Sequence, residues 1–149
     1  MRHIDVKVKN KMTAAEQSGY NDRPFVIISI STPGDNKNEF KRNDSLRDVL
    51  YISFDDIEDA REGGTMMSRE NARDIVNFIV RWHVLGIPEI WVHCDAGISR
   101  SAGVAAAIMK FFNNDDTPIF DNPKYCPNMH CYRYILDAFQ KFVDGTLNR

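Results

Sequence analysis

The sequence predicts a single α/β domain in which a mainly parallel central sheet is flanked by helices. Short apolar runs suited to strands alternate along the chain with longer amphipathic segments suited to helices. The length of 149 residues is that of one domain, and no repeat, low-complexity tract or linker divides it. We therefore treat residues 1–149 as one domain. Ligands of parallel sheets bind at the carboxyl ends of the strands, so the loops that follow strands are the candidate sites.

Four segments are predicted to be strands. Residues 4–9 alternate apolar and charged side chains, which is typical of a half-exposed strand at a sheet edge. Residues 25–30 and 49–54 are nearly continuous apolar runs, which indicates strands that are covered on both faces. Residues 90–93 are a further short strand. The polar stretch over residues 33–44 is expected to be a surface loop with one helical turn.

Three helices are predicted between and after these strands. Ser68 is a suitable N-cap for a helix whose apolar residues recur at helical spacing up to Gly86. Residues 101–113 are apolar almost all round, which places that helix in the middle of the domain. Residues 132–143 carry apolar side chains on one face, so the last helix should pack on one side.

Composition narrows the function classes. The formal net charge is −2 and the isoelectric point is near 6.1, so the overall charge favours neither nucleic acid nor an anionic membrane as a partner. No apolar run approaches the roughly 20 residues of a membrane span, and the N-terminus lacks a signal peptide's apolar segment. The three cysteines, Cys94, Cys126 and Cys131, are too few for a disulfide scaffold. We expect a cytoplasmic protein.

The segment after the predicted strand 90–93 carries the strongest functional signal. It reads His-Cys-Asp-Ala-Gly-Ile-Ser-Arg-Ser from His93 to Ser101. Cys94 closes a buried strand, Gly97 lies where the chain must turn tightly, and Arg100 opens a helix whose first N–H groups have no helical partner. A strand, a short loop and a helix N-terminus together form a cradle for an anion.

Cys94 and Arg100 add chemistry to this cradle. The guanidinium of Arg100 has the planar fork that binds two phosphate oxygens at once. The positive surroundings favour the thiolate form of Cys94, because a helix N-terminus and a nearby cation both stabilise a negative sulfur. A thiolate beneath a bound phosphate is a nucleophile directed at phosphorus.

These residues resemble the signature of the cysteine-dependent protein tyrosine phosphatases, which is His-Cys, five residues, then Arg followed by Ser or Thr. The Ser-Arg-Ser ending and the short chain are most similar to the dual-specificity branch, in its compact bacterial or phage-type members. The resemblance extends from about residue 49 to residue 113. It implies a phosphatase-type α/β fold and hydrolysis of phosphomonoesters through a phosphocysteine intermediate.

The resemblance also implies a role for each residue of the motif. Cys94 would attack phosphorus, Arg100 would hold the phosphate oxygens, and Ser101 would hydrogen-bond the thiolate and help it leave. His93 would orient the loop without taking part in proton transfer. The backbone amides from Asp95 to Arg100 would complete the phosphate-binding loop, whose intervening residues are Asp95, Ala96, Gly97, Ile98 and Ser99.

The general acid of this family is an aspartate on a loop after the preceding strand. That loop offers Asp55, Asp56 and Asp59 here. Matching residues 53–56 to the family pattern, in which an apolar residue precedes two acidic ones, favours Asp56, with Asp55 as the alternative. The general acid would protonate the departing oxygen and would then activate water. The competing interpretation is that these aspartates are solvated or cap the next element.

Cys126 and Cys131 raise the question of a metal site. The two cysteines lie around Pro127 with His130 beside them, but the sequence supplies no second pair of ligands. We therefore interpret the segment as a loop and a helix start. No metal and no cofactor are expected, and the role of these two cysteines stays open.

The leading functional hypothesis is a metal-independent phosphatase whose partner is a phosphorylated protein or peptide. Phosphoinositide phosphatases and RNA 5′-triphosphatases use related loops, but a polyanion favours basic residues, and residues 95–99 have none and include an acid. A module that binds phosphorylated partners without turnover, or with weak turnover, is the alternative of a different class. The sequence does not fix the oligomeric state, and a monomer is our working expectation.

Overall fold

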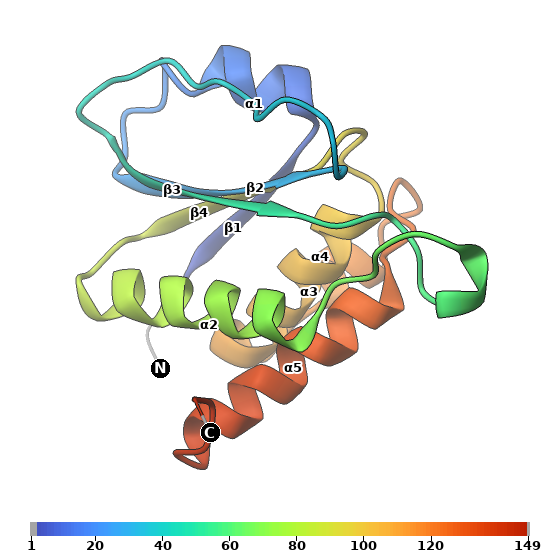
Figure 1. Cartoon of the computed structure of the whole chain (residues 1–149). Coiled ribbons are helices and arrows are strands. Elements are labelled where there is room, and N and C mark those ends of the chain that lie inside the picture. The colour runs from blue at the N-terminus through green and yellow to red at the C-terminus, as the bar shows by residue number, and fades with distance from the viewer. Residues whose placement is uncertain (1–2, 149) are drawn as a thin grey trace.

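The computed structural model describes residues 3–148, in which four parallel strands form one sheet (Figure 1). The spatial order of the strands is β1-β4-β2-β3, and every neighbouring pair is parallel. The α/β fold class with a parallel sheet is therefore confirmed, as is the edge position of β1. The strands are β1 (Asp5–Lys9), β2 (Phe25–Ser31), β3 (Leu46–Ser53) and β4 (Glu89–His93).

Helices cover both faces of this sheet. Figure 1 shows α2, α3, α4 and α5 on one side and α1, with the chain that leads into β3, on the other. The helices are α1 (Lys11–Gln17), α2 (Arg69–Val84), α3 (Arg100–Asn113), α4 (Thr117–Phe120) and α5 (Met129–Val143), with a 3₁₀ turn at Ala60–Glu62. The three predicted helices correspond to α2, α3 and α5, and Ser68 caps α2 as expected.

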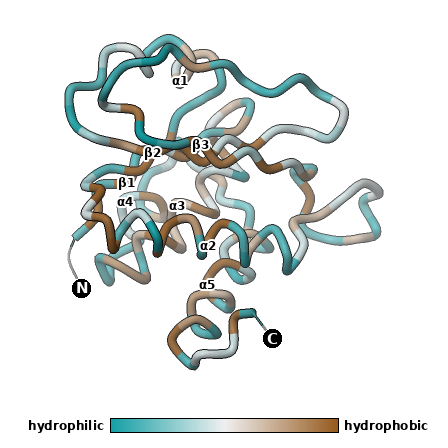
Figure 2. The backbone as a smooth tube through the Cα atoms, turned by 60° about the vertical axis from the view of Figure 1, so that its left-hand side comes forward, coloured by the Kyte–Doolittle hydropathy of each residue, from teal (hydrophilic) through white to brown (hydrophobic). Residues whose placement is uncertain are grey.

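The main core lies between the sheet and the helices α2, α3 and α5. Helix α3 is at its centre, because its residues from Arg100 to Met109 are all buried. A smaller apolar cluster around Phe25, Ile27 and Trp91 lies on the α1 side of the sheet. Figure 2 shows hydrophobic residues along the sheet and the inner helices, whereas the chain around α1 is mostly hydrophilic.

Two expectations about single elements were wrong, and helix α1 was missed. Strand β3 begins at Leu46 and forms a sheet edge, so it is only partly buried rather than covered on both faces. Residues 33–44 contain no helical turn. Helix α1 was not predicted, because it is short and buries only Ala14, which leaves no apolar periodicity to detect.

No helix among residues 3–148 is long and apolar enough to cross a membrane.

Candidate active site

The loop between β4 and α3 lies at the carboxyl edge of the sheet. Cys94 directly follows the last residue of β4 and Arg100 is the first residue of α3, and both side chains are buried. Gly97 turns the loop with a φ of +71°, and a Cβ there would lie 2.8 Å from the backbone of Lys9. Only glycine combines that conformation with that close approach. We call residues 94–100 the 94–100 loop.

The backbone N–H groups of the 94–100 loop indicate an anion-binding site. Within the described chain, none of the N–H groups of residues 95–100 donates a hydrogen bond to another protein atom. A run of unpaired backbone donors that ends at a helix N-terminus is suited to an anionic ligand. This arrangement supports the anion cradle that the sequence predicts for residues 94–100.

Arg100 reaches across the carboxyl ends of three strands. Its Nη1 donates to the carbonyl oxygen of Phe54 at 2.8 Å and to the hydroxyl of Thr32 at 3.1 Å, and its Nη2 donates to the Asp95 carboxylate at 3.1 Å. Its Nε–H is buried and has no hydrogen-bond partner among the described residues. These contacts fix the guanidinium while leaving a donor for a further oxygen.

Cys94 and Ser101 face each other at the start of α3. The thiol sulfur of Cys94 lies 3.1 Å from the Ser101 hydroxyl oxygen, and Ser101 is fully buried. A hydroxyl that donates to a sulfur stabilises the sulfur when it carries negative charge. The structure thus brings together the two residues for which the sequence suggested a nucleophile and its hydrogen-bond donor.

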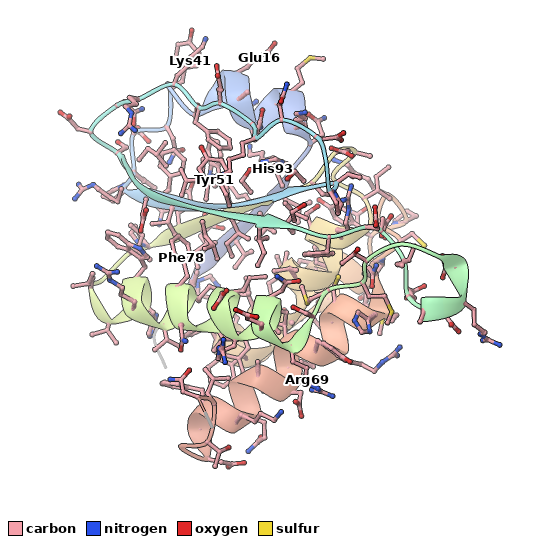
Figure 3. The ribbon with its side chains drawn as sticks, viewed as in Figure 1. Glu16, Lys41, Tyr51, Arg69, Phe78 and His93 are labelled. Carbon is pink, nitrogen blue, oxygen red and sulfur yellow. The ribbon has the colours of Figure 1, made fainter. Side chains whose placement is uncertain are left out.

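His93 lies behind the loop, on the α1 side of the sheet (Figure 3). Its Nδ1 is 3.1 Å from the carbonyl oxygen of Cys94, and its Nε2 is 2.6 Å from the Ser29 hydroxyl and 3.4 Å from the Asn38 amide nitrogen. The carbonyl can only accept, so the proton belongs on Nδ1 and Nε2 accepts from the other two. Burial lowers the pKa of His93 below its ordinary value, which favours this neutral form.

The three candidate acids have different surroundings. Asp56 reaches the 94–100 loop, because its Oδ1 accepts a hydrogen bond of 2.8 Å from the Ser99 hydroxyl. The carboxylate of Asp55 instead accepts from the backbone N–H of Thr65 at 2.8 Å and so closes its own loop. Asp59 is paired with Arg61, and their hydrogen bonds lower the pKa of Asp59. Only Asp56 among the three contacts the 94–100 loop.

Asn128 is the site residue that sequence reasoning missed most clearly. Its amide Nδ2 donates to Asp56 Oδ1 at 3.0 Å and to the carbonyl oxygen of Ile57 at 3.1 Å. Asn128 is a typical N-cap residue before an apolar helix, a signal that predicts the start of α5 but no contact with Asp56. Thr32, Ser29 and Asn38 were also missed, because nothing in the sequence relates them to residue 94 or residue 100.

The segment that contains Cys126 and Cys131 is hydrogen-bonded to the 94–100 loop. The backbone N–H groups of Cys126 and Asn128 donate to the carbonyl oxygens of Ile98 and Ser99 at 3.0 and 2.9 Å. Cys126 is exposed, whereas Cys131 is buried in α5, where burial raises the pKa of its thiol. The part of the chain that the structure describes contains no cluster of metal-ligating side chains.

Comparison with known proteins identifies the fold. No protein-family model and no curated protein sequence matches this chain. Solved structures do match it along nearly their whole length. The PTP-2 phosphatase of Cydia pomonella is 19% identical with a TM-score of 0.63, and the match covers 91% of this chain and 86% of that one.

Two further structures match at similar levels. The human tyrosine phosphatase-like serine/threonine/tyrosine-interacting protein is 18% identical, with 93% of each chain covered and a TM-score of 0.61. PTPMT1 in complex with PI(5)P is 17% identical, with 96% of each chain covered and a TM-score of 0.57. The chain has the protein tyrosine phosphatase fold. Human DUSP28 is also among the matches, so the fold is shared with compact phosphatases of the dual-specificity type.

Proposed function

We propose that this protein is a cysteine-dependent phosphatase that hydrolyses phosphotyrosine, and also phosphoserine or phosphothreonine, in proteins or peptides. The observation that carries the proposal is the set of unpaired donors around Cys94. The N–H groups of residues 95–100 and the buried Nε–H of Arg100 have no protein partner within residues 3–148. The Arg100 Nε–H is buried, and leaving such a donor unpaired costs about 1–3 kcal/mol, which a phosphate oxygen would offset.

In the first step, the Cys94 thiolate attacks phosphorus and the bond between phosphorus and the leaving oxygen breaks. The phosphoryl oxygens are held by the loop amides and by Arg100, whose guanidinium is already positioned by its hydrogen bond to the Phe54 carbonyl oxygen. Asp56, in its acid form, gives its proton to the leaving oxygen, so the alcohol or phenol departs neutral. The product of this step is a phosphocysteine.

In the second step, a water molecule attacks the phosphocysteine. Asp56, now a carboxylate, takes a proton from that water, and the bond between sulfur and phosphorus breaks. The departing thiolate accepts a hydrogen bond from Ser101, whose hydroxyl lies 3.1 Å from the sulfur. Inorganic phosphate is released, and Cys94 and Asp56 return to their starting protonation states. Neither step uses a metal or a cofactor.

A trapping experiment tests this proposal. The protein is mixed with a phosphotyrosine peptide that carries radiolabelled phosphate, quenched in denaturant and examined for label covalently bound to the chain. We expect label on Cys94 and steady release of phosphate, neither of which is affected by EDTA. The Cys94→Ser variant should bind vanadate or phosphate but give neither label nor turnover, because a serine hydroxyl stays protonated at neutral pH. Substantial turnover by that variant would refute the nucleophile.

Phosphoinositide hydrolysis is the second candidate, favoured by the match to PTPMT1 in complex with PI(5)P. The composition of the loop argues against it, because the 94–100 loop has no lysine and its Asp95 carboxylate is half exposed at the rim. A second phosphate near Asp95 would meet like charge. Comparing kcat/KM for a phosphotyrosine peptide and for PI(5)P decides between the two substrates.

A further inference from the structure

The side chain of Asn128 joins the start of α5 to the loop that carries Asp56. It is 2% exposed and precedes α5, where its side-chain Oδ1 accepts the backbone N–H of Cys131 at 3.0 Å. Its Nδ2 donates both to the Asp56 carboxylate and to the Ile57 carbonyl oxygen. One amide side chain therefore connects the start of α5 to the loop that carries Asp56, 72 residues earlier in the chain.

The backbone of Asn128 fixes this point relative to the 94–100 loop. Its N–H donates to the carbonyl oxygen of Ser99 at 2.9 Å. Its carbonyl lies so close to Gly103 of α3 that a Cβ there would overlap with it. Asn128 thus has little freedom to move apart from α3, and the hydrogen bonds of its side chain hold Asp56 at a set place above the loop.

Both hydrogen bonds to Asp56 reach the same oxygen. Oδ1 accepts from Ser99 Oγ and from Asn128 Nδ2, at 2.8 and 3.0 Å, while Oδ2 has no hydrogen bond within the described chain. An oxygen that accepts two donors is the carbonyl-type oxygen of a protonated carboxyl group, so the proton goes to the other one. The pair of donors therefore selects Oδ2 as the oxygen that can donate a proton.

We propose that Asn128 is a positioning residue for the general acid: it orients the carboxyl group of Asp56 so that Oδ2 carries the proton toward the leaving oxygen. This inference rests on the proposed phosphatase function. It adds that proton transfer depends on the N-cap residue of α5, which does not touch the substrate. Removing the amide donor should damage the acid step and leave attack by Cys94 intact.

The test replaces Asn128 with residues that keep the helix cap. In Asn128→Asp and Asn128→Ser, a side-chain oxygen can still accept the Cys131 N–H, but neither side chain can donate to Asp56 as the amide does. Rates are measured on aryl phosphates whose leaving groups range from phenol to dinitrophenol. Thermal unfolding of each variant verifies the fold. Glu58→Gln is the matched control, because Glu58 also joins this loop to α5, by accepting the Met129 N–H, without touching Asp56.

We expect both Asn128 variants to lose about tenfold to a hundredfold in kcat/KM on phenyl phosphate and little on dinitrophenyl phosphate, which needs no acid. Glu58→Gln should keep the wild-type pattern. Adding either Asn128 substitution to Asp56→Asn should cause little further loss, because the acid that Asn128 positions is already absent. Equal losses on all leaving groups would refute a positioning role for Asn128. Failure of the wild type to turn over any aryl phosphate would instead refute the proposed function.

Discussion

The hydrogen bonds of Arg100 show why a lysine, which carries the same charge, could not replace this residue. Its guanidinium makes three hydrogen bonds to the protein and keeps a further buried N–H without a protein partner among the described residues. The planar fork is thus divided, with some donors that fix it and others that can bind an anion. A lysine ammonium is a point charge with three donors and cannot serve both purposes.

We predict that Arg100→Lys lowers kcat/KM on aryl phosphates by at least a hundredfold, because bidentate contact with the phosphoryl oxygens is lost. The fold should persist, since the replacement keeps the charge and the alkyl stem. Steady-state kinetics and circular dichroism measure the two effects. A folded Arg100→Lys variant with near-normal kcat/KM would contradict the cradle described above.

Asp56 and Asp55 are adjacent in sequence and are expected to behave differently. Asp56→Asn should slow phosphates with poor leaving groups by about 10²–10⁴ and should flatten the basic limb of the pH–rate profile. Activated leaving groups should be affected less, since a stable leaving anion needs no proton. Asp55→Asn should keep most activity, because the Asp55 carboxylate binds the Thr65 N–H instead of facing the 94–100 loop. The reversed result would exchange the two roles.

For single helices and strands, the sequence predicts features that depend on local residues. It misses features that depend on which other segments pack or pair with the element. Periodicity was enough to predict α2 and α5, and nearly continuous apolar content was enough to predict α3. The contiguous segment from His93 to Ser101 predicted the strand, loop and helix of the candidate site. Apolar content could not show that β3 is an edge strand, because edge position depends on which strands pair with it. The contact of Asn128 with Asp56 joins residues 72 apart, and no local pattern encodes it.

The packing of α3 against the start of α5 requires glycine, which has no side chain, at position 103. A Cβ at Gly103 would overlap with the Asn128 carbonyl and lie 3.2 Å from the Cβ of Cys131. We predict that Gly103→Ala destabilises the protein by about 1–3 kcal/mol, although alanine favours helices more than glycine does, because overpacking outweighs propensity. Denaturant unfolding measures the change. Lys110→Ala, on an exposed position of the same helix, should stay within about 0.5 kcal/mol of wild type, and an equally stable Gly103→Ala would contradict the packing.

At the scale of the whole molecule, the parallel sheet brings distant chain segments to one edge. Thr32 follows β2, Phe54 follows β3 and Cys94 follows β4, and Arg100 contacts the first two directly. The same sheet places His93 at the end of β4 beside Ser29 of β2. The His93 side chain therefore contacts both the interior of the fold and the candidate site. We therefore expect a substitution of His93 to affect both the stability of the fold and the 94–100 loop.

The buried position of His93 predicts how the stability of the fold depends on pH. Burial is the largest cause that lowers the pKa of His93 in the folded state, although the hydrogen bond to the Cys94 carbonyl and the charge of Asp95 oppose it. The unfolded chain, with a histidine pKa near 6.5, therefore binds a proton at a higher pH than the folded protein does. Below that pH the unfolded state gains stability by protonation, so the contribution of neutral His93 is complete above about pH 6.5 and is lost as the pH falls.

We expect the melting temperature to fall between pH 7 and pH 5 more steeply in the wild type than in His93→Gln. The variant should be less stable at pH 7, because glutamine cannot reproduce the ring's contacts with both Ser29 and the Cys94 carbonyl. Its pH dependence should be weaker, because the titrating group is gone while the other histidines remain in both proteins. The difference between the two curves isolates His93. Parallel curves would show that protonation of His93 costs the folded state nothing and that its ring is not held neutral by burial.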